Sequence, residues 1–486
     1  MSRSAIVLVT CLACLSASAV CAHEPLRVGV AEADITPPEG FPVAGYYHER
    51  LATGVRDPLK AKAIVLRGGH DRAAVVGCDL TGIAIDLSTE VRRRASAKTG
   101  IPADHIILTA THSHTAPDYT RDLYLYLQES AASDAPSQRY AARLIDGIVT
   151  AIVRANANLE PAVLAAGTAT QTTPVSFNRR FVMRDGSVRT WMKLNNPEVV
   201  RAAGPIDPQI GLVLFRGPDQ QPRGLLSNFA LHLDTVGGTL WSADYPYFIE
   251  QSVRQALGSQ VISVFGTGCC GDINHSDPSR AERNTTDIIG KSLGESIVGA
   301  LPQLRPVTDP RLRVLRAVVP VPLQPAPPAQ VERAQALLPQ AKAGQKVEFF
   351  DLVTAYKSLM LAQLRDSSSG AVADEHLSWG LTHTWRGVGE KLPVEVHVLT
   401  FGTDVALVFL PGEIFVELGL AIKQASPFPT TAVIELANCV ETIYVPTRTA
   451  YAVGSYEVTN TTLEPGAGEM LAEAAVRLLR TAAEDN

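Results

Sequence analysis

The sequence predicts an α/β fold in which mixed β-sheets are flanked by helices and a metal site lies at the strand ends. Short apolar runs bounded by turn residues, such as Ile106–Leu108 and Val405–Leu410, are typical of buried strands. Amphipathic stretches such as Leu87–Lys98 alternate with these runs, and this alternation favours an α/β architecture. Polar donors follow several of the strands, where sheets of this class commonly build their sites.

The length, the N-terminal residues and the charge of the chain limit the classes of protein to which it can belong. The chain has 486 residues, of which 46% are hydrophobic, so it can bury a large core. Residues 1–22 have the order of a secretory signal peptide, and we expect export to the periplasm or the exterior. Cys21 leaves a lipoprotein open as an alternative to a freely soluble form. With 43 Lys+Arg against 49 Asp+Glu, no basic stripe exists, which argues against a nucleic-acid partner.

The first strand–helix–strand unit leads to a pair of histidines. Strands at Ala61–Leu66 and Ala73–Cys78 precede the helix, and Ile106–Leu108 follows it. If the last strand continues, His112 and His114 project to the same side, because side chains repeat every two residues along a strand. Two adjacent imidazoles suit a metal site. A bare His-x-His pair also occurs in polar loops, so further donors are needed to support this interpretation.

Later segments continue the same alternation. Val319–Pro328 is rich in proline and predicts a stiff connector, and the helical stretch after it predicts a cap or insertion at about 320–370. Cys78, Cys269, Cys270 and Cys439 are too few for a disulfide scaffold, and one bridge among them is left open. The other expected strands are Ile210–Phe215, Gly224–Ala230, Val261–Phe265, Val394–Phe401 and Val433–Ala437, and the other expected helices are Tyr140–Asn156, Asp244–Ala256, Thr286–Leu301, Ile414–Lys423 and Glu469–Ala483.

Two more donors join His112 at predicted strand ends. His232 follows one strand, and Glu413 stands where another strand gives way to a helix. Two histidines and a carboxylate are a recurrent ligand set for catalytic zinc, with one coordination position left open. Spacing alone leaves open the alternative that these histidines are hydrogen-bonded core residues.

At these residues the chain resembles the neutral/alkaline non-lysosomal ceramidases. The resemblance covers almost all of residues 23–486 and implies a fold like the N-terminal catalytic domain of that family. It rests on five motifs in the order of the family: Asp34-Ile35-Thr36-Pro37 with Gly45-Tyr46, Thr111 to Pro117, Asn178-Arg179, Gly271 to Asn274, and Tyr444 to Arg448 with Tyr456-Glu457.

The resemblance implies one zinc ion per chain, held by four residues. These ligands are His112, His232, Glu413 and Tyr444. It also places a second group beside the metal: His114 and Arg179 at positions needed for activity, and Tyr456 at a position that contacts the substrate.

The implied chemistry gives each residue of the second group a role. His114 is expected to pass a proton to the leaving amine, and Arg179 or Tyr456 to hold the developing oxyanion. Asp272 is expected either to orient a ligand histidine or to cap a turn. These two interpretations have equal support from the sequence.

Two departures from the family concern the substrate. Asn274 and His275 stand where the family has a serine and a proline, and the C-terminal β-sandwich of the family is expected to be absent. The resemblance implies an exported zinc amidase that splits ceramide into a sphingoid base and a fatty acid. Another N-acyl or ester substrate, such as an acylated amino sugar, and a non-catalytic secreted binding protein are the alternatives. A sphingolipid substrate also allows transient contact with a membrane surface.

Overall fold

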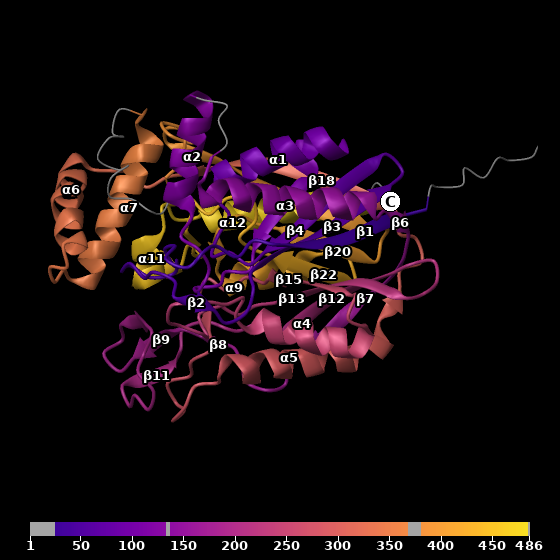
Figure 1. The fold of residues 1–486 in the computed structure, drawn as a ribbon. Helices are drawn as coiled ribbons and strands as arrows, with labels where there is room; N and C mark the ends of the chain where they lie inside the picture. The colour runs from indigo at the N-terminus through magenta and orange to yellow at the C-terminus, as the bar shows by residue number, and fades with distance from the viewer. Residues whose placement is uncertain (1–24, 133–136, 368–380, 485–486) are drawn as a thin grey trace, which may run out of the picture.

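Three β-sheets pack around one shared apolar core, and each carries helices on its outer face (Figure 1). The computed structural model describes residues 25–132, 137–367 and 381–484. The predicted leader, residues 1–22, lies outside the described residues. Apolar side chains from all three sheets, among them Val75, Phe215 and Phe409, meet in the shared core. This arrangement confirms the predicted class of mixed sheets flanked by helices.

The first sheet has the strand order β5-β4-β3-β1-β6. Its strands pair antiparallel except for β4 and β5, which run parallel because the helix α1 connects them. Helices α1 and α3 cover the outer face (Figure 1). The elements are β1 Arg27–Asp34, β3 Lys60–Gly68, β4 Asp71–Cys78, β5 Ile106–Ala110, β6 Glu160–Pro161, α1 Ile85–Thr99 and α3 Tyr140–Ala157.

The second sheet has the order β15-β13-β12-β7-β17. Helices α4 and α5 pack against its outer face through Tyr245, Ile249 and Leu293 (Figure 1). The elements are β7 Val163–Thr170, β12 Gln209–Arg216, β13 Pro222–Phe229, β15 Ile262–Thr267, β17 Arg305–Pro306, α4 Tyr245–Leu257 and α5 Thr286–Ala300.

The third sheet, of order β18-β19-β20-β22, corrects one expectation. The predicted stiff connector is wrong at its start, because Pro320 and Pro322 belong to the strand β18. Since β18 is an edge strand, a residue without an N–H can stand in it without removing a bond of the ladder. The elements are β18 Leu312–Pro322, β19 Lys391–Phe401, β20 Val405–Phe409, β22 Thr430–Ile434, α9 Val416–Ala425 and α12 Ala467–Glu484.

A helical hairpin stands at one end of the molecule, beside α2 and α11 (Figure 1). Its helices are α6, Pro328–Lys342, and α7, Phe349–Arg365. The remaining elements are β2 Gly54–Val55, η1 Ala103–His105, α2 Thr120–Ala132, β8 Phe177–Asn178, β9 Arg180–Met183, β10 Val188–Thr190, β11 Val199–Ala202, β14 Leu240–Trp241, β16 Ile273–Asn274, η2 Leu301–Gln303, β21 Glu413–Ile414, β23 Tyr444–Val445, α10 Ala450–Val453 and α11 Tyr456–Asn460.

The described residues show the state of the cysteines and the character of the helices. Cys78, Cys269, Cys270 and Cys439 are all buried free thiols, so none of them forms a disulfide with another described cysteine. Within the described ranges, the helices lack the combination of length and apolar character that crossing a bilayer requires.

Candidate metal centre

The loop after β5 carries the first two histidines, and its backbone differs from the expected strand. β5 ends at Ala110, and His112 has a positive φ of 76°. A continuing strand therefore does not align His112 with His114, and that prediction is wrong. The turn brings the two rings together all the same, with centroids 4.9 Å apart.

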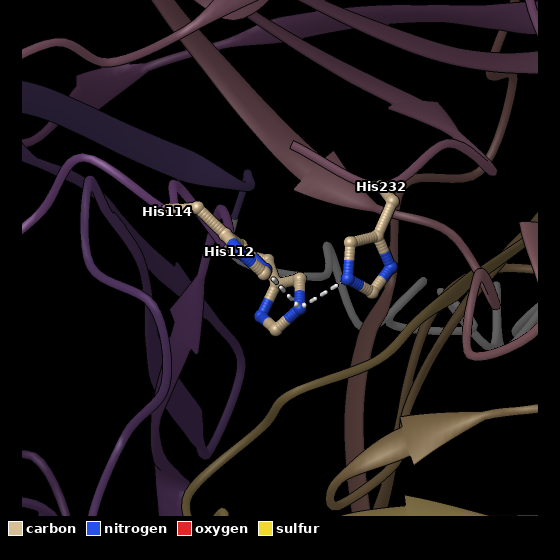
Figure 2. A group of neighbouring side chains, drawn as sticks. All are labelled: His112, His114 and His232. Carbon is tan, nitrogen blue, oxygen red and sulfur yellow. Dashed lines mark hydrogen bonds between the residues drawn. The ribbon is translucent and has the colours of Figure 1, made fainter. Parts of the chain in front are cut away.

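Three imidazoles converge at this point (Figure 2). The Nε2 atom of His112 lies 3.0 Å from Nε2 of His232 and 3.3 Å from Nε2 of His114. His232 reaches the cluster from the loop that follows β13 in the second sheet, whereas the other two come from the first sheet. The metal-binding atoms of these residues all lie within 4.8 Å of one another, so the cluster could hold a metal ion.

Glu413 adds a carboxylate to the same cluster. Its Oε2 atom lies 3.3 Å from Nε2 of His112 and 3.8 Å from Nε2 of His232. This buried oxygen accepts no hydrogen bond from the described residues. A tetrahedral zinc ion with bonds of about 2.0–2.1 Å holds its ligand atoms about 3.3 Å apart, which is close to these spacings. The donor set therefore fits a divalent metal.

Protonation in this cluster also suits metal binding. Burial is the main cause that lowers the pKa of both His114 and His232 well below the ordinary value, and the nearby guanidinium of Arg179 lowers it further. Burial raises the pKa of the Glu413 carboxyl, but His112 and Arg179 outweigh burial, and the net shift is downward. Neutral imidazoles and an ionised carboxylate are the forms that coordinate a metal.

Backbone carbonyls face the second nitrogen of two of these imidazoles. Nδ1 of His112 lies 2.6 Å from the carbonyl of Thr81, and Nδ1 of His232 lies 3.3 Å from that of Cys270. A carbonyl can only accept a hydrogen bond, so each Nδ1 carries the proton and each Nε2 is the unprotonated nitrogen that can bind a metal.

Asp272 makes the capping contact, one of its two expected roles. Its Oδ1 accepts from the N–H of Val416, the first residue of α9, at 2.8 Å. Its Oδ2 accepts from Nδ2 of Asn178 at 2.7 Å. The expectation that Asp272 orients a ligand histidine is not met, because backbone carbonyls face Nδ1 of both His112 and His232.

Tyr444 is brought beside Glu413 by a short parallel pairing. In the β21–β23 pair, Glu413 stands opposite Tyr444. The guanidinium carbon of Arg179 lies 5.3 Å from the centre of the Tyr444 ring. The ring of Tyr456 lies 5.5 Å from that of Tyr444. Both tyrosines that the resemblance points to thus border the histidine cluster.

Arg179 is fixed against the cluster by three contacts. Its Nε donates to Oε1 of Glu457 at 2.9 Å, and its Nη2 donates to the carbonyl of Gly271 at 2.8 Å. Its Nη1 lies 3.4 Å from Nε2 of His232. Burial lowers the pKa of this guanidinium, but Tyr444 and the carboxylate of Glu457 outweigh burial and raise the pKa, so Arg179 stays positively charged.

The sequence did not point to a polar pair behind His114. Asp234 lies 3.8 Å from Nδ1 of His114, and its carboxylate accepts a hydrogen bond from the hydroxyl of Tyr46 at 2.5 Å. Asp234 stands two residues after His232, and Tyr46 belongs to the first of the five motifs, so each is close in sequence to a predicted site segment. Their contact joins positions 188 residues apart, which no local pattern reveals. Glu457 follows Tyr456 in the last of the five motifs, but the sequence indicates no role for it.

Two cavities meet at the histidine cluster. The smaller cavity, about 110 Å³, has His112 and Glu413 in its wall, and Tyr356, Lys357 and Met360 of α7 form another part of that wall. The larger cavity, about 520 Å³, is lined by His232, by the aromatic residues Trp191 and Phe349, and by Asn274 and His275. Both are lined by Tyr46, Tyr47, His114, Tyr444 and Tyr456. The two positions that depart from the family therefore face the larger cavity.

Comparison with known proteins connects this geometry to one family. The family profile described as neutral/alkaline non-lysosomal ceramidase, N-terminal, matches residues 26–275. A neutral ceramidase of Pseudomonas aeruginosa is 29% identical over 241 residues, which are 48% of this chain and 34% of that protein. The aligned part thus spans about a third of the length of this curated relative.

Solved structures show that the fold is shared. The crystal structure of neutral ceramidase from Pseudomonas aeruginosa matches with a TM-score of 0.67 at 19% identity, covering 95% of this chain and 75% of that one. A ceramidase complexed with C2 matches with the same TM-score of 0.67 at 20% identity, covering 95% and 76%. Since the family profile covers more than half of the residues, the chain belongs to the neutral/alkaline non-lysosomal ceramidase family.

Proposed function

We propose that the protein is an exported zinc-dependent amidase that hydrolyses an N-acyl bond, with ceramide as the first substrate to test. The observation that carries this proposal is the buried cluster of His112, His232 and Glu413, whose Oε2 atom accepts no hydrogen bond from the described residues. Membership of the ceramidase family supports the reaction class. The leader-like residues 1–22 support export.

Four residues would hold one zinc ion: His112, His232, Glu413 and Tyr444. When bound, zinc supplies a Lewis acid that polarises the amide carbonyl and promotes the ionisation of water. His114 lies close enough to be a ligand as well, but it lines both cavities, and we assign it to proton transfer. The metal content of variants at these positions separates the two assignments.

The remaining residues act on the substrate itself. Arg179 and the hydroxyl of Tyr456 would donate hydrogen bonds to the carbonyl oxygen as negative charge develops on it. His114 would carry a proton to the amine nitrogen as the C–N bond breaks. Asp234 and Tyr46 lie behind His114, with Asp234 3.8 Å from its Nδ1 and the Tyr46 ring centroid 5.8 Å from its own. The hydroxyl of water ends on the acyl carbon, and its proton ends on the amine.

Product analysis tests the reaction class. Purified protein is incubated with ceramides and with simpler N-acyl amides, and the products are identified by mass spectrometry. Release of fatty acid and free amine by the parent but not by His112→Ala supports the proposal. His70→Ala is the matched control, because His70 is exposed in the turn between β3 and β4. A parent that binds these amides but releases no fatty acid would be a binding protein.

A further inference from the structure

One half-buried cation in the cavity system has no role in the reaction described above. Lys357 of α7 lines the smaller cavity, whose wall also holds His112 and Glu413. Its ammonium donates a hydrogen bond to the amide oxygen of Gln324 at 3.1 Å. Among the described residues, no carboxylate forms an ion pair with this ammonium group. A half-buried lysine thus faces the cavity with only a neutral partner.

This arrangement is costly unless a ligand completes it. Removing an ammonium group from water without a partner of opposite charge costs free energy. Burial lowers the pKa of Lys357 to about 8, so the group is still mostly protonated at pH 7. The other charged residue on this wall outside the metal centre is Asp118, which accepts a hydrogen bond from Thr120 at 3.4 Å. The positive charge of Lys357 therefore remains available to a bound molecule.

The larger cavity is the better place for an acyl chain. It has nearly five times the volume of the smaller one, at about 520 Å³ against about 110 Å³. Trp191 and Phe349 give it aromatic walls. Its two arginines are accounted for, because Arg179 pairs with Glu457 and Arg283 is exposed to solvent. An amide bond held at the metal centre would then direct its amine portion toward Lys357.

We propose that Lys357 is a specificity residue and that the smaller cavity receives the amine portion of the substrate when that portion carries an anionic group, as in an N-acyl amino acid. This inference rests on the proposed amidase function and narrows its substrate class. The group recognised is a carboxylate or a sulfonate on the amine side of the scissile bond. The hairpin of α6 and α7, which supplies Lys357, then determines which amines the enzyme accepts.

The test compares amides that share one acyl chain. N-lauroylglycine and N-lauroyltaurine carry a carboxylate and a sulfonate, and N-lauroylethanolamine is the neutral reference. The parent should show a kcat/KM for the carboxylate or the sulfonate amide at least about tenfold above that for the neutral amide, as expected for one charged hydrogen bond. Lys357→Met should reduce this ratio to about one, and Lys357→Arg should restore part of it.

Two control variants locate the effect. Lys346→Met removes an exposed lysine from the loop of the same hairpin and should leave the ratio unchanged. Arg283→Met removes a cation from the larger cavity. A ratio that falls in Arg283→Met but not in Lys357→Met would overturn the proposal.

The kcat/KM values of the parent protein also test the role of Lys357, even if Lys357→Met fails to fold. Equal or better hydrolysis of the neutral amide would refute the role of Lys357 while the amidase function stands. No hydrolysis of any lauroyl amide or ceramide would instead refute the proposed function. These two failures are therefore distinguishable.

Discussion

Arg179 and Glu457 form a buried ion pair, in which Nε of the arginine lies 2.9 Å from Oε1 of the glutamate. Their side chains are only 3% and 0% exposed. The hydroxyl of Thr190 donates to the other carboxylate oxygen at 2.8 Å. Glu457 thus sets the position of the guanidinium that lies beside His232 and Tyr444, and it is a positioning residue rather than a catalytic one.

Replacing Glu457 should damage both stability and catalysis. Glu457→Gln leaves the buried charge of Arg179 without its counterion, so the free energy of unfolding should fall by about 3 kcal/mol in urea titrations. Because Arg179 would act on the developing oxyanion, kcat should fall at least about tenfold with a smaller change in KM. Glu464→Gln, at an exposed position, is the control. If kcat of Glu457→Gln stays within twofold of the parent value, Glu457 does not position Arg179 for catalysis.

The metal ligands can be separated from the proton donor by metal content. On the proposed assignment the parent should retain zinc after dialysis, whereas His112→Ala and His232→Ala should lose it, because each removes one of four proposed ligands. His114→Ala should keep about one zinc per chain, while kcat falls about 100- to 10,000-fold. Elemental analysis and kinetics on the same preparations provide both readouts.

His70→Ala again serves as the control for this comparison. Loss of zinc from His114→Ala would make the three histidines of Figure 2 the ligand set and would exclude His114 as the proton donor.

A substitution at Gly45 tests whether catalysis depends on the position of the His114 ring. Its φ is +98°, and a Cβ atom there would lie 2.7 Å from Cβ and Cγ of His114. Gly45→Ala should therefore displace the imidazole and lower kcat at least about tenfold. Gly40→Ala is matched, because Gly40 also has a positive φ, of +80°, but no heavy atom within 4 Å of the added carbon.

Both glycine variants should lose about 1–2 kcal/mol of unfolding free energy from the left-handed backbone. Only Gly45→Ala should lose activity in steady-state assays. Equal activities in the two variants would show that His114 tolerates displacement.

The buried His397, which lies away from the histidine cluster, should make the free energy of unfolding depend on pH. Its side chain is fully buried, Nε2 lies 2.9 Å from the carbonyl of Asp104, and burial lowers its pKa to about 4. As the pH falls below about 6.5, the unfolded chain takes up a proton that the folded chain refuses, so stability is lost between about pH 6.5 and 4.

The size of this effect follows from the two pKa values. Between pH 7 and pH 5 the loss from His397 should be about 2 kcal/mol. His397→Gln should lower the stability at pH 7 but show a correspondingly smaller further loss at pH 5, measured by urea unfolding at both pH values. His70→Gln should retain the pH dependence of the parent, since His70 is exposed.

The sheet elements and several site residues were predictable because their signals are local. The strand over residues 405–410 and the position of Glu413 before a helix follow from apolar runs and their interruption, and the structure has β20 and α9 there. The ordered motifs also identified the family. Residues such as Arg179 and Tyr456 came only from that resemblance, since isolated arginines and tyrosines carry no spacing signal.

The remaining features depend on contacts between distant segments. His112 leaves the strand direction because its backbone N–H bonds to the carbonyl of Leu80, a residue from the loop after β4. Apolar periodicity identifies strands but does not determine how three sheets share a core. The function of Lys357 could not be proposed from sequence either, because a lysine in a polar helical stretch normally faces solvent.

The prolines of β18 have a consequence for how the molecule behaves in a crowded solution. An open sheet margin offers unsatisfied backbone donors that can recruit a strand from another molecule and start aggregation. At Pro320 and Pro322 these donors are missing on the outermost strand of the third sheet. Substituting both by valine would create a continuous template for intermolecular pairing, and light scattering at high protein concentration would register the growth of assemblies.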